Sequence, residues 1–214
     1  MINLLVVFLA VFLVSCTADS KLAVLKTALF GTKGDLVSLE QAKLHGDAFI
    51  QATLGKNKAV LEKKGQAGQV IYWQGIGGVA IVTKYGRVVQ LIGIDVELRR
   101  SSFVNSDPLS RNSISTGASL TRILDYMPNY LYDIKAKSKF TVVGRQNITV
   151  LGFRKSLLKV QEIVAFDNFK VKRTNTYWLD PATMLVWKSR QYYAPHAKPI
   201  ILERVHLSSA GAIN

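Results

Sequence analysis

Hydrophobic and polar residues alternate with a period of two along most of the chain beyond position 47. The alternation predicts a strand–turn–strand unit over 48–61, with Gly55-Lys56-Asn57-Lys58 as its turn. Short apolar runs bounded by turn residues follow, and they predict further strands over 70–73, 79–83, 88–92, 140–143, 148–151, 157–166, 173–179, 185–193 and 200–207. Strands without helices between them are typical of an all-β protein, either an antiparallel sandwich or an open, curved half-barrel.

The segment that precedes this region has a helical period instead. Leu22, Leu25 and Leu29 recur at helical spacing, which predicts a short helix over 20–30. A second helical segment is expected over 35–44. We therefore expect the β region to be preceded by a short helix.

Two stretches between the strands are expected to be connections. Arg99 to Gly117 is rich in Ser, Asn and Arg and predicts a long loop, functional or merely mobile, or a crossover between two halves of the sheet. Gly75-Ile76-Gly77-Gly78 lies between two expected strands, so it offers no helix N-terminus to a phosphate. We interpret it as a turn and not as a dinucleotide-binding loop.

The start of the chain has the pattern of a cleaved leader. Leu4 to Val14 is an unbroken apolar run, too short to span a bilayer but of the length found in secretory signals. It ends in Leu13-Val14-Ser15-Cys16, which resembles the bacterial lipobox, where the cysteine receives a diacylglyceryl group and the bond before it is cut. We expect residues 1–15 to be a lipoprotein signal peptide and Cys16 to be lipidated; the alternative is an ordinary signal peptide with a chance cysteine.

The resemblance to lipoproteins also implies a location. In Gram-negative lipoproteins an aspartate directly after the cysteine tends to retain the protein in the inner membrane, and here that position is Thr17. Thr17 favours the periplasmic face of the outer membrane, with the lipid as the anchor. Residues 16–46 then form a lipidated tether with the helical segments, and residues 47–214 form a single antiparallel β domain.

The chain is strongly basic. It has 28 Lys and Arg against 14 Asp and Glu, a formal net charge of +14. Since Cys16 is the only cysteine, the β domain has no disulfide and depends on its core. The expected compartment holds little nucleic acid, so the polyanions that suit this charge are acidic polysaccharide, lipopolysaccharide phosphates and anionic lipid head groups.

Basic residues alternate along three segments of the chain. The three sets are Lys135, Lys137 and Lys139; Lys170 and Lys172; and Lys188 and Arg190. At a period of two, each set points to one face of its strand. If these strands are neighbours, the sheet carries a cationic face that would contact a polyanion. The alternative is that these residues only keep the outer face of the sheet solvated.

Signals for catalysis or metal binding are weak. Asp95 and Glu97 lie two positions apart after a strand, as a pair of glycosidase carboxylates on one sheet face would, but the arginines that follow favour a solvated ion-pair edge. The histidines lie far apart in the sequence: His45, His196 and His206. No Gly-x-Ser-x-Gly motif occurs. We expect no enzymatic activity, no cofactor and no metal site.

Aromatic residues gather near the end of the chain. They are Tyr177, Trp178, Trp187, Tyr192 and Tyr193. Exposed, they would form a stacking platform for sugar rings; buried, they would belong to the core of the sheet.

A hairpin with the sequence NTYWLDPATMLVWKSRQ is expected over 175–191, because Asp180 opens a turn between two strands. This hairpin resembles the YjbF/GfcB family of bacterial lipoproteins. The family typically shows an aromatic residue, an apolar residue, Asp, two variable residues, Thr and Gly, followed by a strand that ends in Ser-Arg-Gln. Met184 stands where the family usually has Gly. The lipobox, Leu29-Phe30-Gly31 and Asp107-Pro108-Leu109 match as well, so the resemblance spans nearly the whole mature chain.

The resemblance implies an antiparallel β protein on the periplasmic side of the outer membrane, from gene sets for exopolysaccharide or O-antigen capsule assembly and export. It implies no catalytic residue and transfers only Cys16 as a site. Our first hypothesis is an outer-membrane lipoprotein that supports assembly or export of a surface polysaccharide by binding the polymer or outer-membrane export proteins. The alternatives are a periplasmic carrier that shelters an acyl chain in a half-barrel cavity and, third, a glycan-modifying hydrolase with Asp95 or Glu97 as its acid.

Overall fold

A computed structural model describes residues 46–110 and 112–204, and almost all regular structure in this range is β-strand. The strands are β1 (Phe49–Leu54), β2 (Asn57–Ala67), β3 (Val70–Gln74), β4 (Ala80–Lys84), β5 (Arg87–Ile92), β6 (Glu97–Phe103), β7 (Ser119–Met127), β8 (Leu131–Val150), β9 (Phe153–Phe166), β10 (Val171–Leu179), β11 (Val186–Gln191) and β12 (Ile200–Glu203). Short 3-10 turns are η1 (Gly46–Ala48), η2 (Ile76–Gly78), η3 (Pro108–Ser110) and η4 (Asp167–Phe169). These residues include no helix that is long and apolar enough to cross a bilayer. The expected leader, lipidated cysteine and helical segments lie outside the described residues.

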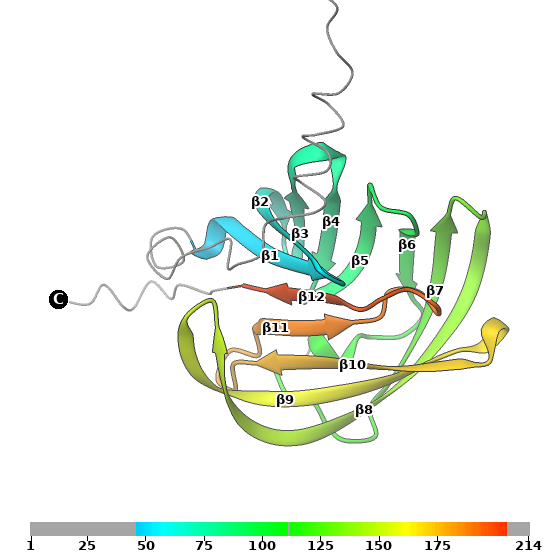
Figure 1. Cartoon of the computed structure of the whole chain (residues 1–214). Helices are drawn as coiled ribbons and strands as arrows, with labels where there is room; N and C mark the ends of the chain where they lie inside the picture. The colour runs from blue at the N-terminus through cyan, green and yellow to red at the C-terminus, as the bar shows by residue number, and fades with distance from the viewer. Residues whose placement is uncertain (1–45, 111, 205–214) are drawn as a thin grey trace, which may run out of the picture.

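The strands form one closed barrel in which each strand pairs antiparallel with its neighbours in sequence (Figure 1). The first and last strands complete it, with Gln51 of β1 opposite Glu203 of β12 and Leu54 opposite Ile200. The expectation of an antiparallel all-β protein is confirmed, whereas the sandwich and the open half-barrel are both wrong in detail. Closure pairs the backbone groups that an open sheet would leave at its two edges.

The core fills the barrel because inward and outward residues alternate along each strand. On β8, Ile134, Ala136, Ser138 and Phe140 are buried, while Lys135, Lys137 and Lys139 between them are exposed. Trp73 of β3 is 1% exposed in the largest core cluster, and its Nε1 donates a hydrogen bond to Thr83 Oγ1 at 2.9 Å. The interior therefore has the packed apolar character of a small barrel.

Strands occur where the sequence predicted none. β6 occupies 99–103 of the expected loop, β7 begins just after it, and β8 begins at Leu131, well before the run expected at 140–143. The loop prediction is wrong for 99–103 because Arg100 and its polar neighbours hide the strand pattern. The remaining loop carries Asp107 and Leu109, which are buried, so this part of the connection packs inside the barrel.

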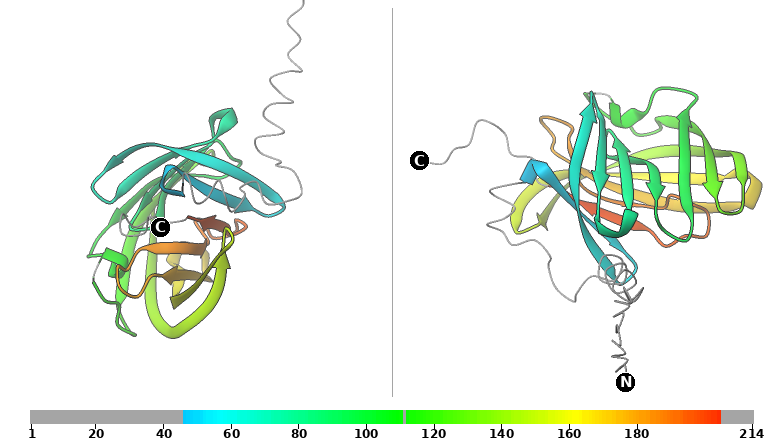
Figure 2. Two further views of the ribbon diagram at one scale, coloured as in Figure 1. Left: turned by 90° about the vertical axis from the view of Figure 1, so that its left-hand side faces the viewer. Right: turned by 90° about the horizontal axis from the view of Figure 1, so that it is seen from above.

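β8 and β9 form a long, strongly curved hairpin of 20 and 14 residues (Figures 1 and 2). The register shifts between Val142 and Gly144, and such a bulge bends a strand. The hairpin tip folds back so that Val150 and Leu157 pack in one cluster with Phe49 of β1. The runs that were predicted as two strands over 140–143 and 148–151 are therefore one bent strand.

The β4–β5 turn packs closely against β11 at one end of the barrel. Gly86 has φ 78°, and a Cβ atom at this position would lie 2.6 Å from Cβ of Val186. Its carbonyl oxygen accepts a hydrogen bond from Gln191 Nε2 at 2.9 Å. A glycine is thus required here by both conformation and space.

Replacing Gly86 tests this packing. Gly86→Ala is expected to lower the free energy of unfolding by about 2 kcal/mol or more, because the left-handed conformation and the contact with Val186 both oppose a side chain. Chemical denaturation measures the change.

Gly65→Ala is the matched control. A Cβ atom at Gly65 would meet only Tyr72 at 3.8 Å, an ordinary contact, so this variant is expected within about 1 kcal/mol of wild type. Equal stability of the two variants would contradict the close approach of the β4–β5 turn to β11.

Candidate functional site

Basic side chains gather on the outer surface of four adjacent strands, β8 to β11. Cross-strand register places them on one face: Lys137 and Lys172 both lie opposite Ala165, and Lys159 and Lys188 both lie opposite Trp178. We call this surface the outer basic face and define it by Lys135, Lys137, Lys139, Lys159, Lys172, Lys188 and Arg190. The barrel therefore brings together six of the seven basic residues singled out in the sequence.

The remaining one, Lys170, does not belong to a strand. It caps η4 with φ 52° and precedes β10, so its expected alternation with Lys172 along one strand is wrong. Lys159 of β9 was missed by sequence reasoning because the nearest alternate positions of its strand are Leu157 and Gln161, so no run of alternating lysines marks it. Contact of these residues with a polyanion stays a prediction.

The outer basic face has few compensating acids among the described residues. Lys137 pairs with Asp167 and Lys188 with Glu203, each at 2.8 Å. In contrast, no ion pair within the described range involves Lys135, Lys139 or Lys172. Strands are about 4.8 Å apart and alternate residues about 7 Å, so neighbouring cations on this surface are roughly 7–10 Å from one another. Such an array presents a continuous positive potential to a long anion.

Neutral side chains between the cations suit a hydroxyl-rich polymer. Thr141, Gln161 and Thr174 alternate on the same outward positions, and Ile163 is 49% exposed among them. Hydroxyl and amide groups offer both donors and acceptors to sugar hydroxyls. The surface therefore combines charge with hydrogen-bonding capacity.

The C-terminal aromatic residues do not form one platform. Tyr177 is fully buried, and Trp187 and Tyr193 are 4% and 6% exposed. Trp178 and Tyr192 remain half-buried, and each ring is covered by a cation, Lys159 at 6.0 Å and Arg190 at 4.9 Å from the ring centroids. The stacking platform of five rings is thus wrong, because most of these rings serve the core.

The acids proposed for catalysis lie at the edge of the barrel. Glu97 at the start of β6 accepts a hydrogen bond from the Gly93 amide and pairs with Arg99, both at 2.8 Å. Asp95 is exposed in the bend before β6, so the two do not share a strand face. His196 packs edge-on against Phe169, and residues 46–110 and 112–204 contain no group of three metal-ligating side chains.

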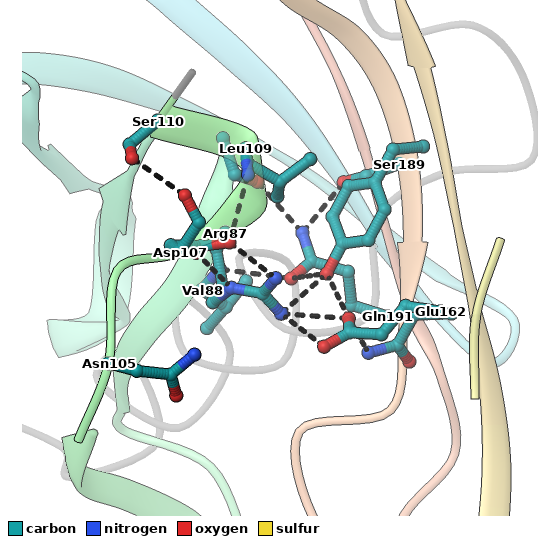
Figure 3. A network of polar contacts seen from close by, with 12 residues as sticks. Arg87, Val88, Asn105, Asp107, Leu109, Ser110, Glu162, Ser189 and Gln191 are labelled. Atoms are coloured by element: carbon teal, nitrogen blue, oxygen red, sulfur yellow. Dashed lines mark hydrogen bonds and ion pairs between the residues drawn. The ribbon is translucent and has the colours of Figure 1, made fainter. Parts of the chain in front are cut away.

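A fully buried polar network lies inside the barrel (Figure 3). The Arg87 guanidinium donates to Asp107 through Nε at 2.6 Å and to both carboxylate oxygens of Glu162 through Nη1 at 2.9 and 2.8 Å. Tyr177 donates its hydroxyl proton to Glu162 at 2.8 Å, and Asn175 donates to the same carboxylate at 3.0 Å. The network thereby joins β5, β9, β10 and the β6–β7 loop.

The charges in the network stabilise each other. Burial alone would raise the pKa of Glu162, but attraction by Arg87 and Arg122 and the hydrogen bonds outweigh it and lower the pKa to about 2. Burial would likewise lower the pKa of Arg87, and the two carboxylates hold it well above its usual range. Burial raises the pKa of Tyr177. Arg87, Glu162 and Tyr177 therefore each keep one charge state across the ordinary pH range.

This network positions the fold and does not perform chemistry on a ligand. Arg87, Glu162 and Tyr177 have no exposed surface, so no substrate reaches them. Asp107 also accepts from the Leu109 amide at 3.0 Å, which shapes the β6–β7 loop locally, and the ion pair of Asp107 with Arg87 holds this loop to the barrel interior. Sequence reasoning missed the network, although Glu162 is a charged residue among the otherwise apolar inward positions of β9.

Among the described residues, two cavities lie beside the packed core. The larger, of about 680 Å³, lies between the ends of β1, β2, β4, β5 and β12 and is mostly apolar. The smaller, of about 170 Å³, lies near the β4–β5 turn and the β10–β11 hairpin, with Trp73, Trp187 and Arg204 in its lining. Small-molecule sites are commonly about 300–1,000 Å³, so the larger cavity has the size of a ligand site.

Comparison with known protein families shows which family the chain belongs to. The model of a family described as "Group 4 capsule polysaccharide lipoprotein gfcB, YjbF" matches residues 23–205. The chain belongs to the YjbF family. The predicted resemblance is therefore confirmed, and with it a chain of lipoprotein type from a family associated with a capsule polysaccharide.

Relatives of this YjbF-family chain agree in sequence and in fold. The Escherichia coli K12 protein named "Uncharacterized lipoprotein GfcB" is 26% identical over 198 residues, which cover 89% of this chain and 92% of GfcB. The crystal structure of the hypothetical lipoprotein YmcC from Escherichia coli K12 superposes with a TM-score of 0.69 at 19% identity and covers 83% of this chain and 98% of YmcC. The barrel is thus a fold that YmcC shares.

The β10–β11 turn of this YjbF-family chain explains the unusual residue in its hairpin. Asp180 Oδ1 accepts hydrogen bonds from the Ala182 and Thr183 amides at 2.9 and 3.1 Å, as the sequence predicted for a turn that opens at this residue. Met184 has φ 58°, the left-handed region that favours glycine. A Gly, as the sequence resemblance led us to expect here, would adopt this conformation without strain, and Met184 adopts it at a cost in strain.

The buried charges give this YjbF-family barrel a defined pH dependence. The pKa of Glu162 is lowered to about 2 in the folded state, so its contribution to stability is present above its usual range and is lost as the pH falls from about 4.5 towards 2. Glu162→Gln is expected to lower the free energy of unfolding by about 3 kcal/mol at pH 7. Urea denaturation of both proteins from pH 7 to pH 3 measures the difference.

The pH series separates this interaction from other acid effects. The stability difference between wild type and Glu162→Gln should shrink as the pH falls below about 4.5, since Glu162 then takes up a proton in the unfolded wild-type chain while it stays ionised in the folded one. A difference that stays constant down to pH 3 would contradict the charge pairing of Arg87 with Glu162.

Proposed function

We propose that this protein is a lipid-anchored component of the periplasmic face of the outer membrane that supports export of an acidic surface polysaccharide. Its outer basic face binds the polymer, and its lipid on Cys16 keeps that face close to the export site. Outer-membrane export proteins are the expected protein partners.

The observation that carries the proposal is the convergence of basic residues from four strands on one surface. Solvation alone requires cations on many surfaces, but it does not require them in register across neighbouring strands. Lys135, Lys139 and Lys172 are exposed, so their charges are available to a ligand. A polymer with repeated negative charges can contact several of them at once, and weak contacts then add up along its length.

Membership in a family of capsule polysaccharide lipoproteins supports the choice of polymer. A net charge of +14 on the chain favours encounter with a polyanion over encounter with a neutral glycan. The contacts are exposed, so they are screened by salt and reversible. Reversibility suits a protein that hands a polymer onward and does not store it.

Charge reversal on the outer basic face tests the proposal. The variant Lys135→Glu, Lys139→Glu, Lys172→Glu is expected to bind an acidic capsule polysaccharide at least about tenfold more weakly than wild type at low ionic strength. The reason is that attraction becomes repulsion. Affinity is measured by biolayer interferometry of the immobilised protein at several salt concentrations. The wild-type affinity should fall as salt rises, and the variant should be nearly insensitive to salt.

A matched variant distinguishes the surface from the net charge. Lys56→Glu, Lys64→Glu, Arg154→Glu changes the charge by the same amount at three exposed positions outside the outer basic face. It should retain most of the wild-type affinity. If both triple variants lose affinity equally, binding follows net charge and not this surface, and the proposed site is wrong.

A further inference from the structure

The larger cavity is a deep apolar space at one end of the barrel. Its most buried lining residues are Leu61, Ile81 and Leu91, which are 0–1% exposed, and Ala52 and Ile200 come from the strands that close the barrel. These residues all point inward from their strands, so the cavity is part of the barrel interior. The cavity opens to solvent on one side, and water beside these apolar side chains would have few polar partners, so this part of the cavity favours an apolar ligand.

The cavity has the capacity of a lipid chain. Its volume is about 680 Å³. Taking about 30 Å³ for a group of the size of water or a methylene, it holds roughly 20 such groups. This capacity matches one long acyl chain.

Polar residues lie where the cavity meets the solvent. Asn57, Lys58, Asp95, Glu97 and Lys198 line this rim. Lys58 and Lys198 are positive and Asp95 and Glu97 are negative, so the rim mixes both signs of charge and does not select a strongly anionic head group. An apolar interior beneath a polar rim fits an amphiphile whose head group stays outside.

The loop beside the rim exposes an apolar tip. A Cβ atom at Gly93 would lie 2.7 Å from the Gly78 carbonyl oxygen, so the β3–β4 loop directly contacts the β5–β6 loop that lines the rim. Ile76 in the β3–β4 loop is 69% exposed. An exposed isoleucine next to the entrance is suited to dip into a lipid surface.

We propose that this cavity binds one acyl chain of a membrane phospholipid, with the head group at the polar rim. Burial of each methylene provides the affinity, and the polar rim determines how deeply the acyl chain enters the cavity. The site uses the barrel interior and none of the outer basic face, so it stands or falls separately from polysaccharide binding.

Photolabelling of the full chain tests the proposal. The protein is reconstituted in vesicles of phosphatidylethanolamine and phosphatidylglycerol that contain a phospholipid with a diazirine on one acyl chain. After irradiation and trypsin digestion, mass spectrometry locates the label. We expect it on cavity peptides such as 59–63, and we expect Ala59→Phe, which fills the cavity, to reduce labelling about fourfold for each methylene that it displaces.

Two further variants keep the result unambiguous. Ala80→Phe adds the same side chain next to Ile81, at the position that alternates with this cavity-lining residue, and should leave the labelling unchanged. Ala59→Leu is a smaller change for the case that Ala59→Phe does not fold, and it should give a smaller decrease. The proposal would be overturned if the label were found only on residues that do not line the cavity. It would also be overturned if all variants were labelled equally. Cavity labelling that appears only after Cys16→Ala would also overturn it, because the occupant would then be the chain's own anchor.

Discussion

The interaction on which the barrel interior depends is the double ion pair of Arg87 with Asp107 and Glu162. A buried arginine is tolerated only where carboxylates and hydrogen bonds replace water around it. Here one guanidinium contacts a carboxylate from β9 and another from the β6–β7 loop. The loop is thereby drawn into the barrel, where Leu109 joins the core cluster around Phe140. One polar contact thus decides which part of the interior is filled by the protein itself.

The filled and unfilled parts of the barrel have different consequences for function. Around Arg87 the interior is packed and closed to ligands, whereas the end of the barrel near Leu61 and Ile81 keeps an apolar cavity. The outer basic face lies on the opposite side of the strand walls from both. Because inward and outward residues alternate, the barrel carries an apolar cavity and a charged outer surface without either disturbing the other.

Sequence reasoning found the outward pattern better than the inward one. The shared face of the β8 lysines could be predicted from the sequence, because Lys135, Lys137 and Lys139 are separated by the small residues Ala136 and Ser138. Closure of the barrel was not visible, because it depends on pairing of the four-residue β12 with β1, some 150 positions away in the chain. The partners of Arg87 were equally hidden. Glu162 lies 75 residues from it, and only its place in the apolar phase of β9 marks it as inward.

The central claim, that the outer basic face serves polysaccharide export, is tested most directly in cells. The gene is deleted, and the polysaccharide on the surface and inside the cell is measured together after complementation with wild type or with the charge-reversed outer basic face. Wild type is expected to restore the surface polymer, and the charge-reversed protein is expected to leave less polymer outside and more inside. Loss of both pools, or a full surface layer with the charge-reversed protein at normal abundance, would contradict it.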